Sequence, residues 1–134
     1  MFRLVKQFRF EASHMLPEHD GKCSRLHGHS WVGSIICEGP ILHVDGPKAG
    51  MLIDYADLSA IVKPIVEERL DHFHLNDSLG LKNPTSEAIA VWIWKAVYKA
   101  ASEEMRKILY GVIIEETCTS RCEYYPRESL KHLL

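Results

Sequence analysis

The chain has 134 residues, of which 46% are hydrophobic and 25% are charged, with a net charge of -2. These values are ordinary for one soluble globular domain, and we expect a single domain over residues 1–134. They argue against a nucleic-acid-binding protein, which normally carries a basic stripe. No apolar run reaches the ~18 residues that a membrane-spanning helix needs, and the N-terminus is unlike a signal peptide. We therefore expect a cytoplasmic protein without a membrane partner.

Strands are predicted in the N-terminal part of the chain. Residues 2–12 alternate in the manner of a strand with one apolar face. Residues 15–26 contain proline, glycine and aspartate and are a predicted loop. Residues 27–38 form the second predicted strand, residues 39–50 a turn rich in glycine and proline, and residues 51–54 the start of a third strand.

Two helices and a last strand follow. Residues 55–70 carry apolar side chains at helical spacing, but Pro64 predicts a kink or a short first segment. Residues 85–101 have a clearer apolar stripe, and Thr85 can cap its first turn. Residues 112–117 are the last predicted strand. The expected fold is α+β, an antiparallel four-stranded sheet with two helices on one face. The other sheet face needs cover, which favours self-association.

Three histidines form the main chemical signal. His27 and His29 are two residues apart on a predicted strand, so they point to the same face. His14 lies just past the first predicted strand, and a hairpin would bring all three imidazoles together. Three imidazoles suit zinc and leave a fourth position open for catalysis. Such histidine pairs also occur on strands without a metal. The other isolated histidines are expected at the surface: His19, His43 and His132.

Two further groups are candidates for proton transfer. Cys23 lies in a polar loop four residues before His27, where a nearby cation would favour the thiolate. A buried, inert thiol is the alternative. Asp71 precedes His72 and can orient its imidazole, although His74 offers a competing ring.

The remaining cysteines give a weaker signal. The four cysteines lack the paired spacing of a structural zinc site, and in a cytosol they are expected to stay reduced. Cys118 and Cys122 are expected to be buried thiols rather than catalytic ones.

Six short blocks form a recognisable set when they are taken in order. They are residues 10–14 (FEASH), 23–29 (CSRLHGH), 52–58 (LIDYADL), 70–72 with 75–76 (LDH, LN), 83–87 (NPTSE) and 116–119 (ETCT). Together they resemble the 6-pyruvoyl-tetrahydropterin synthase family over nearly the whole chain. The turn at residues 39–50 departs from the family in being longer than usual.

The resemblance implies a metal centre and a catalytic group. The matching residues for the zinc ligands are His14, His27 and His29. Cys23 matches the catalytic cysteine, which acts as a base at the substrate side chain. Asp71 and His72 match the pair that completes the catalytic triad from a neighbouring subunit.

The resemblance also implies a binding site for the pterin ring. Glu116 matches the glutamate that anchors the ring, since a carboxylate can accept two parallel hydrogen bonds. Glu115 points to the opposite face of the predicted strand, so only one of the two can serve. Three residues at the start of the second predicted helix match a contact to the pterin: Thr85, Ser86 and Glu87. For Thr85, simple capping of the helix is the alternative.

For assembly, the resemblance implies the tunnelling fold (T-fold). Subunits of that fold form trimers whose sheets close into a barrel, and two trimers stack into a homohexamer with sites between subunits.

For activity, the resemblance implies a lyase acting on 7,8-dihydroneopterin triphosphate. Residues 25–31, 75–87 and 116–122 look like the branch that forms 6-carboxy-5,6,7,8-tetrahydropterin. That branch releases acetaldehyde and triphosphate, on the route to queuosine. The alternatives are the 6-pyruvoyl branch and a non-enzymatic zinc-binding scaffold. Lys22 and Arg25 could meet the triphosphate, although solvated loop charges explain them as well.

Overall fold

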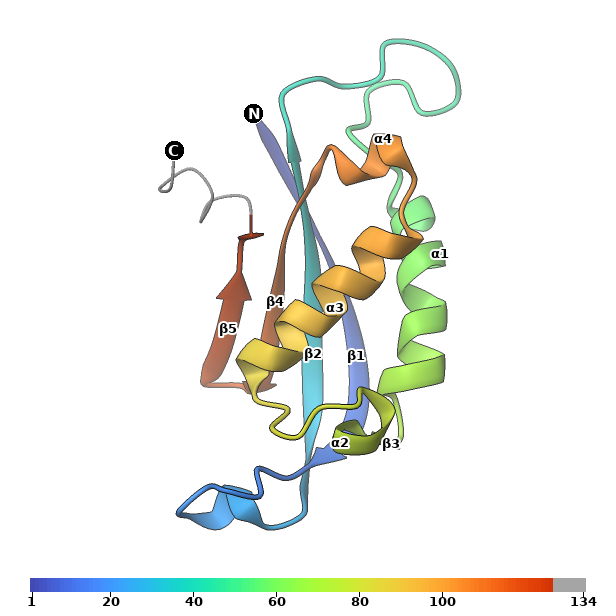
Figure 1. Ribbon diagram of the computed structural model, residues 1–134. Helices are drawn as coiled ribbons and strands as arrows, with labels where there is room; N and C mark the ends of the chain where they lie inside the picture. The colour runs from blue at the N-terminus through green and yellow to red at the C-terminus, as the bar shows by residue number, and fades with distance from the viewer. Residues whose placement is uncertain (127–134) are drawn as a thin grey trace.

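The computed structural model describes residues 1–126 (Figure 1). The strands are β1 (Phe2–His14), β2 (His27–Gly39), β3 (Phe73–His74), β4 (Leu109–Thr117) and β5 (Ser120–Tyr124). The helices are α1 (Tyr55–Ile65), α2 (Leu75–Ser78), α3 (Ser86–Ala100) and α4 (Glu103–Arg106). A short 3-10 turn, η1 (Lys22–Ser24), lies between β1 and β2, and a π-helical turn, η2 (Val66–Leu70), follows α1.

The sheet has five strands in the order β3-β1-β2-β4-β5. Strands β1 and β2 pair antiparallel from Phe2 opposite Gly39 to His14 opposite His27. Strands β4 and β5 continue the antiparallel pairing, whereas β3 is parallel to β1. The α+β class is confirmed. The expected antiparallel four-stranded sheet is wrong, because within residues 1–126 the sheet has five strands and one of them, β3, runs parallel to its neighbour.

The expected strand at residues 51–54 is the clearest error. Its apolar residues Leu52 and Ile53 are buried in the core, but the segment joins no sheet. It is an irregular connection, tied back to the preceding loop by a hydrogen bond from His43 N to Met51 O. A short apolar run indicates burial, and periodicity alone cannot tell which backbone structure carries it.

The helices match the expectation more closely. Asp54 caps α1 by accepting a hydrogen bond from Ala56 N. The α-helical part ends at Ile65, directly after Pro64, and the chain continues as the π-helical turn η2. Proline has no N–H to donate to the preceding turn, which agrees with the short first segment predicted.

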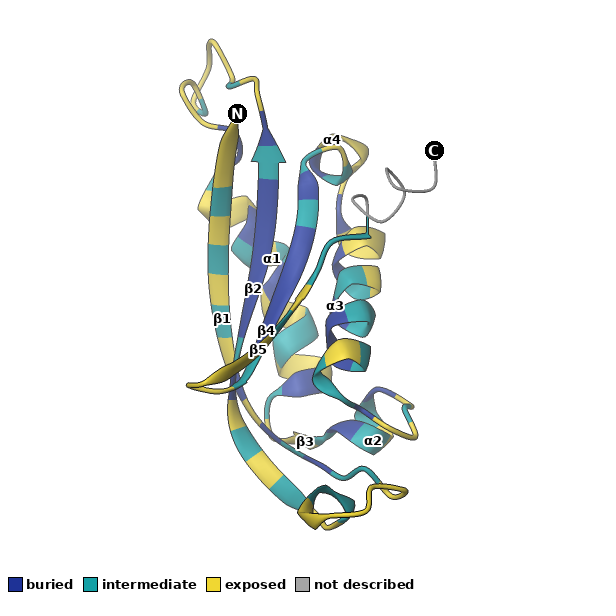
Figure 2. Ribbon diagram, turned by 90° about the vertical axis from the view of Figure 1, so that its left-hand side faces the viewer, coloured by how far each residue is buried: buried dark blue, intermediate teal, exposed yellow. Residues whose placement is uncertain are grey.

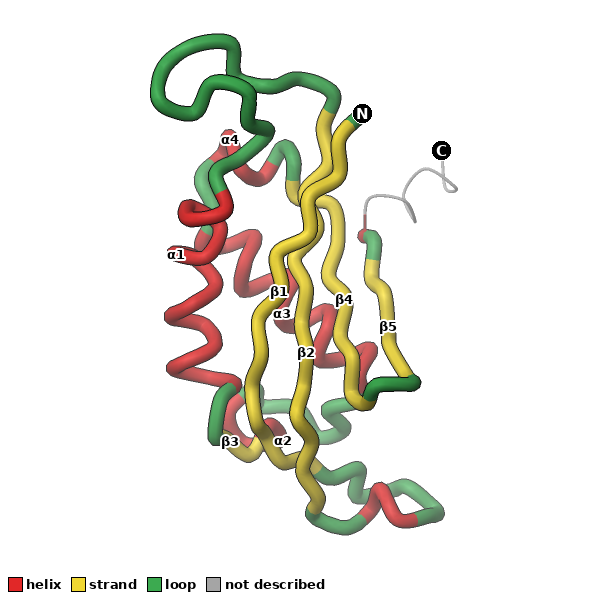
Figure 3. The backbone as a smooth tube through the Cα atoms, turned by 180° about the vertical axis from the view of Figure 1, so that it is seen from behind, coloured by secondary structure: helices red, strands yellow, loops and turns green. Residues whose placement is uncertain are grey.

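The molecule has two layers. Helices α1 and α3 lie against one face of the sheet (Figures 1 and 2), and the core between them is apolar. Among residues 1–126 no element covers the other sheet face, which lies in front in Figure 3. Within the same range no helix is long and apolar enough to cross a membrane. The described elements thus leave one broad face of the sheet open.

Candidate metal centre and active site

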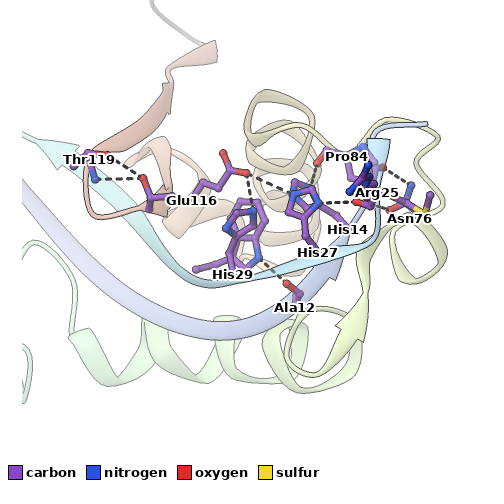
Figure 4. A network of polar contacts seen from close by, with 12 residues as sticks. Ala12, His14, Arg25, His27, His29, Asn76, Pro84, Glu116 and Thr119 are labelled. Atoms are coloured by element: carbon purple, nitrogen blue, oxygen red, sulfur yellow. Dashed lines mark hydrogen bonds and ion pairs between the residues drawn. The ribbon is translucent and has the colours of Figure 1, made fainter. Parts of the chain in front are cut away.

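The three histidines meet at one end of the β1–β2 pair, as predicted. His14 is the last residue of β1 and lies opposite His27, the first residue of β2; His29 lies opposite Ala12. The ring centroids are 4.5 Å apart for His14 and His27, 5.2 Å for His14 and His29, and 4.9 Å for His27 and His29. Figure 4 shows the rings gathered beside Glu116.

Backbone carbonyls fix the orientation of two of these rings. His14 Nδ1 lies 2.8 Å from Pro84 O, and His27 Nδ1 lies 2.7 Å from Arg25 O. A carbonyl oxygen only accepts hydrogen bonds, so each Nδ1 carries a proton, and in the neutral form of each ring the lone pair is on Nε2. Histidine ligands of metals are commonly oriented in this way, by a partner on the other ring nitrogen.

Burial favours the neutral form of two of the three rings. Desolvation lowers the pKa of His14, whose side chain is only 2% exposed, and also lowers the pKa of His29. Neutral imidazoles are the form that binds a metal ion, because protonation removes the lone pair. The local electrostatics therefore favour a cation bound by the rings over protons on them.

The cluster also has the ligand atoms of a metal site, and two of its buried nitrogens lack hydrogen bonds. One ligand atom from each of His14, His27, His29 and Glu116 lies within 4.8 Å of the others. Glu116 Oε1 is 2.9 Å from His29 Nε2 and 3.4 Å from His14 Nε2. Despite this proximity, neither of these buried nitrogens makes a hydrogen bond of acceptable geometry within the described part of the chain. Such a buried polar atom costs ~1–3 kcal/mol, which a bound cation would offset.

A cavity of about 270 Å³ opens beside the cluster and collects most of the predicted binding residues. The predicted residues in its lining come from β1, η1, the start of α3 and β4: His14, Cys23, Thr85, Ser86, Glu87 and Glu116. Sequence reasoning missed the contribution of β5, namely Ser120 and Arg121. No pattern in the sequence placed β5 beside α3.

The side chains of Glu116 and Thr85 have defined orientations in this cavity. Glu116, rather than Glu115, reaches the histidines, and Glu115 pairs with Val32 along the sheet. Thr85 Oγ1 accepts a hydrogen bond from Ala88 N at 3.1 Å, so Thr85 caps α3 and can still donate its hydroxyl proton.

The Asp71–His72 pair lies elsewhere. His72 Nδ1 is 2.9 Å from Asp71 Oδ2, and Asp71 Oδ1 accepts a hydrogen bond from Glu11 N at 2.8 Å. These contacts, first the Glu11 amide and then His72, lower the pKa of Asp71. His74 instead lies 3.0 Å from Ser13 Oγ, so His72 is the ring that Asp71 orients.

His72 is largely exposed. It has a left-handed backbone with φ of 64°, and its side chain is 79% exposed. The groove that it borders contains neither Cys23 nor Glu116. Within one chain, the structure does not bring the pair to the cavity.

The remaining cysteines and charged residues differ in part from expectation. All four cysteines are free, but Cys118 is exposed in the β4–β5 turn, so its expected burial is wrong. Cys122 is half-buried and lines the cavity, where burial and then Glu87 raise its pKa. His19 and His43 lie at the surface as expected, and His132 lies outside the described residues. Lys22 and Arg25 are exposed, and neither lines the cavity.

Comparison with known proteins identifies the family. A family model described as 6-pyruvoyl tetrahydropterin synthase matches residues 3–127, and the chain belongs to this family. A Synechocystis protein named 6-carboxy-5,6,7,8-tetrahydropterin synthase is 46% identical over 130 residues, covering 96% of this chain and 98% of that protein. A Haemophilus influenzae protein of the same name is 31% identical over 143 residues, covering 92% and 99%.

A solved structure supports the same assignment. The 6-pyruvoyl tetrahydropterin synthase of Caenorhabditis elegans superposes with a TM-score of 0.79 at 27% identity, covering 92% of this chain and 94% of that one. The single chain therefore has the fold of this family's enzymes.

Proposed function

We propose that this chain is a zinc-dependent lyase of queuosine (7-deazapurine) biosynthesis. It converts 7,8-dihydroneopterin triphosphate to 6-carboxy-5,6,7,8-tetrahydropterin and releases acetaldehyde and triphosphate. The observation that carries the proposal is the cavity shared by His14, Cys23 and Glu116, in a chain 46% identical to a protein named for this product. The enzyme acts in the cytoplasm, where free cysteines persist.

Zinc is the ion that fits the donors best. Three imidazoles with no thiolate ligand are typical of a catalytic zinc site, in which a fourth position stays open. Bound there, zinc supplies Lewis acidity toward hydroxyl groups of the substrate. The chain's own contribution is to hold His14, His27 and His29 close together. Glu116 then serves the pterin ring rather than remaining a metal ligand.

The ring is held by hydrogen bonds from two elements, β4 and the start of α3. The Glu116 carboxylate accepts from the amino group and the ring N–H of the pterin, an arrangement that two parallel oxygens suit. The Thr85 hydroxyl, already an acceptor from Ala88 N, donates its proton to the ring. Ser86 and Glu87 complete the contact at the start of α3.

Proton transfer is assigned to Cys23 and to a pair from a neighbouring subunit. The Cys23 thiolate removes a proton from the substrate side chain, and His72, held by Asp71, assists it. Because His72 is exposed and does not line the cavity that holds Cys23 and Glu116, we assign it to the cavity of another copy. The open sheet face suits a trimeric barrel, and two stacked trimers give a homohexamer.

The 6-pyruvoyl product is the alternative outcome, favoured by the likeness to the Caenorhabditis elegans enzyme. Incubating the zinc-loaded protein with 7,8-dihydroneopterin triphosphate and identifying the product by mass spectrometry decides between them. We expect the 6-carboxy product and acetaldehyde. A 6-pyruvoyl product without acetaldehyde would support the alternative, and no turnover would favour a zinc-binding scaffold.

A further inference from the structure

Asn76 joins three segments of the chain beside the histidine cluster (Figure 4). Its Oδ1 accepts a hydrogen bond from Met15 N at 3.0 Å, and its Nδ2 donates to Met15 O at 2.8 Å. The same Nδ2 donates to Lys82 O at 3.2 Å. The side-chain amide thus pairs with the backbone of Met15 at both of its hydrogen-bonding groups, as a neighbouring strand would.

Both of the bonded residues adjoin parts of the metal centre. Met15 directly follows His14, and Lys82 lies two residues before Pro84, whose carbonyl accepts from His14 Nδ1 at 2.8 Å. Asn76 therefore ties the backbone that carries His14 to the segment that carries its carbonyl partner.

His14 needs such support more than His29 does. Strand β1 ends at His14, so the ladder of hydrogen bonds to β2 stops there. His29 lies inside the paired region of β2, with paired residues on both sides. Beyond the end of β1, the Asn76 amide takes over the pairing of the next residue, Met15.

We propose that Asn76 is a positioning residue of the metal centre. It holds the His14 Nδ1 to Pro84 O hydrogen bond in place and so keeps His14 Nε2 directed at the ion. This inference rests on the proposed metal site, but it concerns a hydrogen bond that the chain makes between its own groups. Residues that orient metal ligands in this way typically change metal affinity by ~10–100-fold when they are replaced.

The chain supplies a matched control. Lys82 Nζ forms an exposed ion pair with Glu18 Oε1 at 2.7 Å, which links the same two segments. Lys82→Met removes this link and leaves the hydrogen bonds of the Asn76 amide in place, because the amide contacts Lys82 only through its backbone carbonyl. A general loosening of these segments would affect the Lys82 and Asn76 variants alike.

The test compares Asn76→Asp, Asn76→Ala and Lys82→Met as intact chains. Asn76→Asp keeps the shape but turns a carboxylate oxygen toward two carbonyl oxygens, so it should repel them. Zinc affinity is measured by competition with a chelator, and site geometry by the visible absorption of bound Co²⁺. We expect both Asn76 variants to lose ~10–100-fold in zinc affinity with a weakened Co²⁺ spectrum. Lys82→Met should match the wild type in both.

A second readout uses metal-free protein. Nitrogen NMR of the neutral His14 ring should show the Nδ1–H form in the wild type and in Lys82→Met, and a mixture in Asn76→Ala. Unchanged zinc affinity in the Asn76 variants, or an equal loss in Lys82→Met, would overturn the inference. If the wild type bound no zinc, the proposed function would fail, and the His14 ring form would still decide the role of Asn76. Asn76→Ser replaces any variant that does not fold.

Discussion

The hydrogen bonds at the histidine Nδ1 atoms decide how the site receives its metal. Pro84 and Arg25 bond these atoms through their carbonyls, so contacts within the chain itself fix the ring orientations of His14 and His27. We therefore expect these two side chains to be ordered before a metal binds. Preorganisation of this kind raises affinity because the entropy of fixing the side chains is not lost again.

The same burial makes the metal-free protein sensitive to acid. The pKa values of His14 and His29 are lowered in the folded chain. Below the ordinary histidine value of about 6.5, the unfolded chain therefore binds protons that the folded chain does not. The free energy of unfolding should fall as the pH drops through this window. Urea denaturation of metal-free protein at several pH values measures it, and His14→Asn should show a shallower loss. Stability that is flat, or that rises as the pH falls, would contradict the prediction.

Binding and chemistry can be separated at two residues of the cavity. Glu116→Gln replaces an acceptor oxygen by a donor facing the ring N–H, and an unpaired buried polar group costs ~1–3 kcal/mol. Affinity for a non-reactive pterin should fall by at least about tenfold, since ~1.4 kcal/mol corresponds to one decade. Cys23→Ala removes the base and no ring contact, so it should bind the pterin normally while turnover is lost.

Direct titration with the pterin measures both effects. Glu115→Gln is the control, because Glu115 pairs with Val32 and lies outside the cavity. If Glu115→Gln weakened pterin binding and Glu116→Gln left it unchanged, Glu115 rather than Glu116 would be the residue that binds the ring. Loss of binding in Cys23→Ala would give Cys23 more than a role in proton transfer.

At the scale of elements, the periodicity of apolar residues was sufficient to predict the strands and the helix that bury one face. It placed β1, β2, β4 and α3 within a few residues of their bounds. It could not find β3, which is two residues long and pairs through contacts far along the chain. Nor did it find β5, whose residues 120–124 are mostly polar and carry no clear alternation.

The β1–β2 pair depends on a glycine that neither strand propensity nor periodicity explains. A Cβ added at Gly33 would lie 2.1 Å from Phe8 Cζ, because the Phe8 ring covers that position. Gly33→Ala should therefore displace the ring and destabilise the fold by ~1–3 kcal/mol, the usual cost of overpacking. Chemical denaturation of the variant measures this change.

A double-mutant cycle assigns the cause. In a Phe8→Ala background the ring is absent, so Gly33→Ala should cost much less. An equal cost in both backgrounds would place the strain in the backbone instead of the ring.

At the scale of the whole molecule, the sharing of sites can be tested by mixing. Cys23→Ala and His72→Ala should each be inactive as pure oligomers. After subunit exchange, some sites combine an intact Cys23 with an intact His72 from another copy, and part of the activity should return. Exchange is verified with differently tagged chains. Mixed oligomers that stay inactive would argue for a site within one chain.

How far the sequence predicts the site depends on distance along the chain. Alternation on a strand was enough to bring His27 and His29 together, and a hairpin added His14. The Pro84 carbonyl and the Asn76 amide lie 70 and 61 residues from their partners in the His14 segment. No local pattern reports contacts between such distant residues, which arise only when the whole chain has folded.

The exposed position of His72 has a consequence for how the rate varies with dilution. Under the proposed assignments, a solitary chain holds the metal ligands and the ring-binding carboxylate, but its cavity lacks the imidazole of His72, which is exposed elsewhere on the chain. Turnover per chain then depends on how many chains are associated. Below the concentration at which oligomers dissociate, doubling the protein should more than double the rate, although each chain still binds zinc.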